Sequence, residues 1–112
     1  LALNYGARAE LVDAARALVE RARHNGTVEI NEAAISDLLS TRGVPDPDRL
    51  ISPSGELRMS NFLLWQLAYA ELYFTKTLWP DFYQKNLMAA IQSYRARERR
   101  FGLTSAQIGG KT

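Results

Sequence analysis

Residues 50–74 read LISPSGELRMSNFLLWQLAYAELYF, and this stretch decides which fold the chain can adopt. Residues 49–51 form a short strand candidate, and the Ser, Pro and Gly of residues 52–56 indicate a loop. Residues 60–70 are apolar on almost every side, which predicts a helix buried between layers or against another subunit. Aromatic and β-branched residues at 72–75 predict the next strand.

The flanking segments continue this alternation. Residues 8–24 carry apolar side chains at helical spacing, which predicts an amphipathic helix. Asn31 is a good N-cap for a second helix. Asp81 with Gln84 resembles the capping box of a last helix that runs to about Arg100. The side chains that we expect the second and last helices to bury are Ala34, Ile35, Leu38, Leu39, Leu87, Ala90, Ile91 and Tyr94.

The chain opens with an apolar run that stops at Asn4-Tyr5-Gly6, which is typical of a strand leading into a helix. We therefore expect a strand at residues 1–4 and a chain that is part of a longer domain. The expected order is strand, helix, helix, strand, helix, strand, helix. This order predicts an α/β fold, a parallel β-sheet with flanking helices.

Bulk composition narrows the function classes. The 112 residues suffice for one domain, and 46% hydrophobic content is too high for a disordered tail. The net charge of +2 gives little reason to expect a polyanion partner. Because there is no cysteine, disulfides and thiolate metal sites are excluded. The single histidine, His24, lies in a polar stretch and is expected to be a solvated residue at a helix end.

The printed residues predict neither a membrane span nor a signal peptide. No stretch reaches the roughly 20 apolar residues that a membrane span needs. Residues 1–6 show no basic start and no cleavage-site pattern of a signal peptide. We therefore expect a cytoplasmic protein without a transmembrane segment.

The loop at residues 52–60 is the candidate site. Ligands of α/β proteins lie beyond the carboxyl ends of the strands, and a helix starting near Ser60 would offer free N–H groups to phosphate oxygens. Gly55 would let the backbone approach closely, and Arg58 could hold two oxygens. These residues predict a phosphate or diphosphate site. The alternative is an ordinary loop with a capping serine and a surface arginine.

A family resemblance favours the diphosphate interpretation. Residues 54–74, followed by Leu-Trp-Pro-Asp-Phe at 78–82, resemble the signature of cis-prenyltransferases, the undecaprenyl-diphosphate-synthase type of isoprenyl transferase. Asn4-Tyr5-Gly6 and the Arg-Glu-Arg-Arg-Phe-Gly stretch at 97–102 match its flanks. The resemblance implies that residues 1–102 are the C-terminal half of such a domain, with a flexible tail at 103–112.

The resemblance also implies an activity, the cis-condensation of isopentenyl diphosphate onto an allylic prenyl diphosphate. Ser52, Arg58, Met59 and Ser60 would bind substrate, and Glu71 would be associated with Mg²⁺. The enzymes are homodimers, here expected to pair through the helix at 60–70, and a lipid product would bring them to the membrane periphery. The growing chain lies in an apolar tunnel, toward whose closed end Leu1 and Leu3 would sit unless they are ordinary core.

Two departures from the family pattern stand out. The family has an arginine at the position of Ser52, where a hydroxyl carries no charge, so we predict weak binding of isopentenyl diphosphate. The Asp-Gly-Asn-Gly-Arg-Trp stretch that binds the allylic diphosphate and its Mg²⁺ is not in the sequence. We therefore expect no catalytic residue in this chain and no turnover by the chain alone. The acids Asp46, Asp48, Glu56 and Asp81 are expected to be turn and cap residues.

Alternatives remain for the chain and for one residue. The chain could be a non-catalytic partner subunit of an active cis-prenyltransferase. Glu71 lies eleven residues after Ser60, so it could serve a partner's site or be a structural acid instead of a metal ligand. Nucleic-acid binding is a third class, disfavoured because arginines interleaved with Glu98 are typical of a solvated helix end. The arginines in question are Arg95, Arg97, Arg99 and Arg100.

Overall fold

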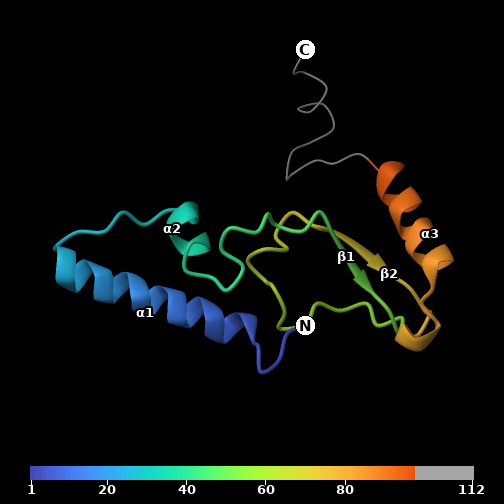
Figure 1. Cartoon of the computed structure of the whole chain (residues 1–112), viewed down its shortest axis with the longest axis horizontal. Coiled ribbons are helices and arrows are strands. Elements are labelled where there is room, and N and C mark those ends of the chain that lie inside the picture. Colours follow the sequence, from blue (N-terminus) through green and yellow to red (C-terminus); the bar gives the residue numbers. More distant parts are fainter. Residues whose placement is uncertain (98–112) are drawn as a thin grey trace, which may run out of the picture. The chain divides into compact units, whose positions relative to one another are not determined.

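The computed structural model describes residues 1–97, which divide into two compact units. The first unit combines residues 1–46 with residues 59–65. The second unit combines residues 47–58 with residues 66–97 of the described part. Figure 1 shows the helices and strands of both units along the chain. The predicted tail at 103–112 and the arginines beyond Arg97 lie outside the described residues.

Helix α1 (Ala7–Asn25) confirms the predicted amphipathic helix of the first unit. Its buried side chains are Ala7, Ala14 and Leu18, which share one face at helical spacing. The helix ends at Gly26, whose φ of 79° favours glycine and whose N–H donates to the carbonyl of Ala22 at 2.9 Å. The apolar spacing therefore predicted the extent of this element but only part of its buried face, because Leu18 is buried whereas Ala15 and Val19 are exposed.

Helix α2 (Glu32–Ser36) begins where its cap predicts. The side-chain oxygen of Asn31 accepts the N–H of Ala34 at 2.9 Å, which satisfies one of the free donors of the first turn. Turns follow the helix, and Leu39 within them is buried. The helix is thus shorter than predicted, and Leu38 and Leu39 of the expected apolar face lie in the turns after it.

The predicted helix at residues 60–70 is wrong. This segment consists of bends and turns, and Leu63 has a φ of 48°, in the left-handed region that interrupts a right-handed helix. Residues 59–65 belong to the first unit and residues from 66 to the second. Within the first unit the indole N–H of Trp65 donates to the hydroxyl of Ser36 at 3.0 Å. Tertiary anchors therefore override the helical preference of these residues.

The second unit holds a parallel pair of strands, β1 (Arg49–Ser52) and β2 (Glu71–Phe74). Their register places Arg49 opposite Glu71 and Ser52 opposite Phe74. The ladder extends beyond the strands, because the N–H of Thr75 donates to the carbonyl of Ser52 at 3.0 Å. Both strands lie within one residue of their predicted ranges, and their parallel pairing is confirmed.

A 3₁₀ turn, η1 (Trp79–Asp81), and helix α3 (Gln84–Arg95) follow the sheet. The predicted capping box of Asp81 and Gln84 is wrong, because the side-chain oxygen of Asn86 instead accepts the N–H of Tyr83 at 3.0 Å. Leu87 is exposed rather than buried, whereas Ala90 is fully buried. Ile91 and Tyr94 are half-buried, as the predicted face of this helix requires.

The predicted strand at residues 1–4 does not form either. Asn4 has a φ of 51°, which is incompatible with an extended strand, and Leu1 and Leu3 are exposed. A strand needs a neighbour to pair with, and the strands of the described residues are β1 and β2. No helix within residues 1–97 has the length and apolar content to cross a membrane.

Candidate functional site

The candidate loop leaves the carboxyl end of β1 at Ser52 and turns back along the extension of β2. The N–H of Ser54 donates to the carbonyl of Thr77 at 3.2 Å, and the N–H of Gly55 donates to that of Thr75 at 2.8 Å. These two backbone amides therefore already donate within the chain, and the loop's remaining candidate donors are the serine hydroxyls and Arg58. Gly55 is needed for its φ of 75°.

Arg58 projects from this loop with most of its side chain exposed. Its Nε donates to a carboxylate oxygen of Glu56 at 2.7 Å. Such an exposed pair contributes little to stability, and the guanidinium keeps donors that a bound anion could engage. The loop thus presents one arginine that is partly neutralised by its own neighbour.

Ser60 belongs to the first unit, because the boundary between the units falls between Arg58 and Met59. Ser60 and Met59 are exposed, and no helix begins at this point. The expected helix N-terminus at the site, with its free N–H groups and positive dipole end, is therefore wrong. Four predicted substrate-binding residues thus divide between the units, with Ser52 and Arg58 in one and Met59 and Ser60 in the other.

Asn61 is a residue whose role the sequence did not reveal. Its backbone carbonyl accepts the N–H of Ala7 at 3.0 Å, and its side-chain oxygen accepts the N–H of Arg8 at 2.8 Å. It therefore caps α1, whose own N-cap, Gly6, has no side chain to do so. The next residue, Phe62, forms an edge-to-face contact with Tyr5, with ring centroids 5.6 Å apart.

Tyr5 is itself held in place. Its hydroxyl donates to Glu10 at 2.6 Å, and Glu10 also accepts the N–H of Ser40 at 2.7 Å. Two hydrogen bonds to Asn61 and the Phe62–Tyr5 ring contact therefore hold the segment that carries Ser60 against the start of α1.

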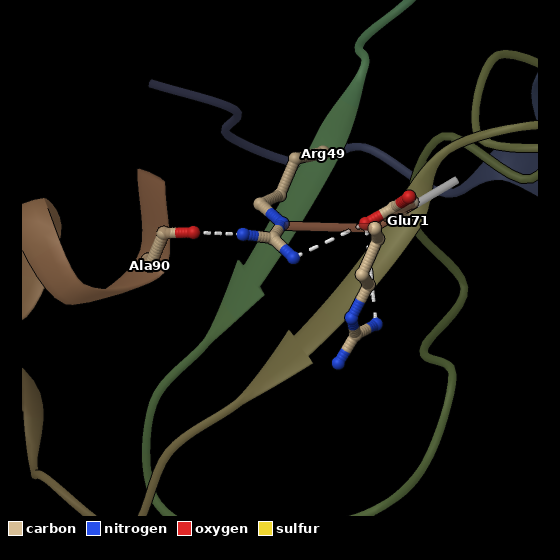
Figure 2. A network of polar contacts seen from close by, with 4 residues as sticks. Arg49, Glu71 and Ala90 are labelled. Carbon is tan, nitrogen blue, oxygen red and sulfur yellow. Dashed lines mark hydrogen bonds and ion pairs between the residues drawn. The ribbon is translucent and has the colours of Figure 1, made fainter. Parts of the chain in front are cut away.

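Glu71, the predicted metal ligand, lies at the opposite end of the sheet from the candidate loop. Figure 2 shows Arg49 of β1 reaching both Glu71 of β2 and the carbonyl of Ala90 in α3. The Arg49 Nη2 to Glu71 Oε2 distance is 3.2 Å, and an Nη1 of Arg97 lies 3.9 Å from the same oxygen. One carboxylate thus compensates charge from two arginines.

Two aromatic rings complete the surroundings of Arg49. Its guanidinium carbon lies 5.2 Å from the ring centroid of Tyr73 and 5.3 Å from that of Tyr94. Both distances are typical of cation–π contacts. Arg49 Nε is buried and has no hydrogen-bond partner among the described residues. The cluster therefore joins β1, β2 and α3 through one almost fully buried cation.

This arrangement does not fit a resident Mg²⁺. The Glu71 oxygen that faces Arg49 already lies against a positive charge, and a cation there would meet two guanidinium groups. Mg²⁺ also needs several oxygen ligands in an octahedral arrangement. Within residues 1–97 no group of three acidic, histidine or cysteine side chains could hold a metal ion. In this chain the geometry favours the structural role of Glu71.

An apolar hollow of about 490 Å³ lies in the first unit, between α1 and residues 28–35. Leu1 and Leu3, expected near the closed end of a tunnel, do not line it and are exposed. The side chains that line it are Leu11, Ala14, Ala15, Leu18, Val19, Ala22, Val28, Ile30 and Ile35.

Comparison with known proteins gives a consistent result. The model of the Prenyltransf family, undecaprenyl diphosphate synthase, matches residues 1–102. The chain is 56% identical over 111 residues to an isoprenyl transferase of Porphyromonas gingivalis, covering 96% of this chain and 43% of the relative. It is 50% identical over 113 residues to a ditrans,polycis-undecaprenyl-diphosphate synthase ((2E,6E)-farnesyl-diphosphate specific) of Xanthomonas axonopodis pv. citri, covering 99% and 44%.

Solved structures agree. Lavandulyl diphosphate synthase from Lavandula x intermedia, in complex with dimethylallyl diphosphate, matches with a TM-score of 0.85 and 44% identity, covering 91% of this chain and 45% of that one. A probable undecaprenyl diphosphate synthase from Campylobacter jejuni matches with a TM-score of 0.77 and 38% identity, covering 91% and 46%. The chain therefore spans less than half the length of the relatives that it matches. By sequence and by fold, it belongs to the undecaprenyl diphosphate synthase family of isoprenyl transferases.

Proposed function

We propose that this chain carries the isopentenyl-diphosphate-binding part of a cis-prenyltransferase. The observation that carries the proposal is the position of the Ser52–Arg58 loop, beyond the carboxyl end of β1 in a parallel sheet. Ligands of such sheets bind at that edge. Family membership supplies the substrate class, a diphosphate attached to an isoprene unit.

The proposed roles of the residues follow from their donors. Arg58 offers a planar set of N–H groups that match two phosphate oxygens at once. Ser60 and Ser52 each add a hydroxyl donor, and Met59 adds its backbone. In the reaction of the whole protein, a carbon–carbon bond forms between the isopentenyl and allylic units while diphosphate leaves and a proton is lost. This chain binds and orients the isopentenyl partner in that reaction.

The chain alone is expected to turn over no substrate. Positioning two diphosphates supplies most of the rate enhancement in this type of reaction. The stretch that binds the allylic diphosphate in the family is not in the sequence. We propose that activity needs a polypeptide that supplies this second site.

Mg²⁺ dependence stays a prediction for the whole protein. Glu71 is the candidate Mg²⁺ ligand, but the pairing of Glu71 with Arg49 and Arg97 supports a structural role for this carboxylate in this chain. No step of the proposed function of this chain depends on a metal.

Homodimerisation through residues 60–70 is likewise a proposal, although these residues do not form a helix. Phe62 and Tyr69 each expose an aromatic side chain, as an interface needs. We further propose a cytoplasmic location, with a lipid product that draws the whole enzyme to the membrane periphery.

Calorimetric titration of isopentenyl diphosphate tests the proposal on the unchanged chain and on Ser52→Arg. A second charge-assisted contact should tighten binding by roughly tenfold to a hundredfold. Gln92→Arg adds the same charge on an exposed position of α3 and should leave the affinity unchanged. Absence of binding by both the unchanged chain and Ser52→Arg would contradict the proposed function.

A non-catalytic partner subunit is the second candidate, favoured by the uncharged Ser52 in the loop. Co-expression with the full-length Porphyromonas gingivalis relative separates the two candidates. A stable heterodimer that retains activity, together with no diphosphate binding by this chain, would favour the partner role. Absence of a heterodimer would exclude it.

A further inference from the structure

Lys76 lies directly against the candidate loop. A Cβ placed on Gly55 would lie 3.4 Å from Cγ of Lys76 and 3.5 Å from its Cα, which are ordinary packing distances. The backbone bonds from Ser54 to Thr77 and from Gly55 to Thr75 flank Lys76 on both sides. The stem of this lysine therefore packs over the turn of the loop, and its side chain is exposed.

The loop needs a cation from elsewhere if it is to bind a diphosphate. Residues 52–58 contain one acid, Glu56, and one base, Arg58, so their formal charges cancel. The two side chains also pair with each other at 2.7 Å. A diphosphate is a polyanion, and a neutral loop gives it little electrostatic attraction. Lys76 would change the formal charge of this surface from zero to +1.

We propose that Lys76 binds the diphosphate and supplies the positive charge that Ser52 does not, an assignment that rests on the proposed function. A lysine ammonium on a flexible four-carbon stem suits this role, because it reaches a phosphate oxygen as a mobile point charge. Lys76 forms no ion pair with a carboxylate within residues 1–97, so its charge is available to a ligand.

No pattern in the sequence singles out Lys76, since it lies 24 residues after Ser52, beyond the end of the second strand. The parallel pairing brings them to one edge of the sheet: Ser52 lies opposite Phe74, and Lys76 follows two residues later. The assignment thus depends on register and on the close packing against Gly55.

Titration calorimetry on the full chain provides the test, with isopentenyl diphosphate and inorganic pyrophosphate as separate probes. Lys76→Met should raise the Kd for both probes about tenfold, because it removes one charge-assisted contact. Lys76→Arg should keep most of the affinity. Lys85→Met removes another exposed lysine, from α3, and should leave both Kd values unchanged.

A double-mutant comparison sharpens the test. In the Ser52→Arg chain a second cation is already present, so Lys76→Met should raise the Kd by less than about threefold. With Ser52 kept, the loss of affinity caused by Lys76→Met should also become smaller as salt is added, since exposed charges are screened. Melting temperatures of all variants should match that of the unchanged chain, which shows that the fold is kept.

Each other outcome has a defined meaning. Equal binding by the unchanged chain and Lys76→Met overturns the role of Lys76 and leaves the proposed function standing. Binding by Ser52→Arg alone, with none by the unchanged chain, also overturns it, because Lys76 then fails to replace the arginine. Absence of binding by both chains overturns the proposed function, and the assignment of Lys76 with it.

Discussion

The side-chain oxygen of Asn61 accepts the backbone N–H of Arg8 at 2.8 Å, across 53 positions of sequence. Together with the bond from Ala7 to its carbonyl, this contact makes Asn61 the cap that Gly6 cannot be. The same residue follows Ser60 directly, so the start of α1 and one part of the candidate site share a single support. Stability of the helix and placement of Ser60 are therefore coupled.

Loss of this cap should be measurable. Asn61→Ala is expected to lower the free energy of unfolding by about 1 kcal/mol, as for other side-chain caps. Asn61→Asp keeps an acceptor for the N–H of Arg8 and should retain most of the stability. Hydrogen exchange should locate the loss at the first turn of α1. Asn86→Ala is the matched control, because it removes the capping side chain of α3. It should speed hydrogen exchange at the start of α3 and leave the first turn of α1 unchanged.

Arg49 should be the most sensitive polar residue of the second unit. Arg49→Met leaves the half-buried carboxylate of Glu71 with only the more distant Arg97, and should cost about 3 kcal/mol by urea unfolding. Arg49→Lys should recover only part of this, since one ammonium cannot reach both Glu71 and the Ala90 carbonyl.

Arg16→Met is the control for Arg49. Arg16 forms an exposed pair with Asp13 on α1, so its replacement should change the stability by less than about 0.5 kcal/mol. A chain with Arg49→Lys that is as stable as the unchanged one would show that the two contacts of Arg49 are not both required.

Mg²⁺ should not stabilise this chain through Glu71. Because that carboxylate is paired with arginines, we expect the same melting temperature in excess Mg²⁺ and in excess chelator. Glu71→Gln should lower the melting temperature equally in both conditions. A stabilisation by Mg²⁺ that disappears in Glu71→Gln would instead assign the metal role to this residue.

Gly55 offers a test of backbone strain. Because its φ is 75°, Gly55→Ala should lower the free energy of unfolding by about 1 kcal/mol. Gly26 has a φ of 79° and nothing within 4 Å of an added Cβ, so Gly26→Ala reports strain alone. Because the added Cβ at Gly55 meets Lys76 at ordinary packing distances, Gly55→Ala and Gly26→Ala should lose similar amounts of stability. A much larger loss for Gly55→Ala would show that Lys76 cannot adjust.

Local patterns predicted the elements that local forces determine. The helical spacing of apolar residues within 8–24 predicted α1, and Asn31 predicted the start of α2. Strand β2 was predicted from its aromatic and β-branched content, and β1 as a short strand before the Ser-Pro-Ser-Gly loop. The parallel pairing followed from the order of the elements, which depends on general rules of chain connection.

Distant partners determined what the sequence did not reveal. The helix predicted at 60–70 fails where Asn61 and Trp65 find partners far along the chain, and Leu63 takes a left-handed conformation between them. Gly6 could have indicated the contact of Asn61 with α1, because a helix that begins after a glycine needs a side-chain cap from elsewhere in the chain.

The Arg49–Glu71 pair needed the strand register before it could be recognised. Each residue stands at the start of a strand, and opposite charges at these two positions are consistent with direct pairing. Without the register, the sequence leaves the metal, partner-site and structural roles of Glu71 open, and the metal role depends on family resemblance alone.

The 53-position separation of Asn61 from Arg8 also bears on how the chain folds. Helix α1 can form early, since helices of its length grow in microseconds or less. Its cap arrives only after the loop that contains α2, β1 and the site loop has closed, and such distant contacts form slowly. The first turn of α1 should therefore gain protection late in refolding, together with the segment that carries Ser60.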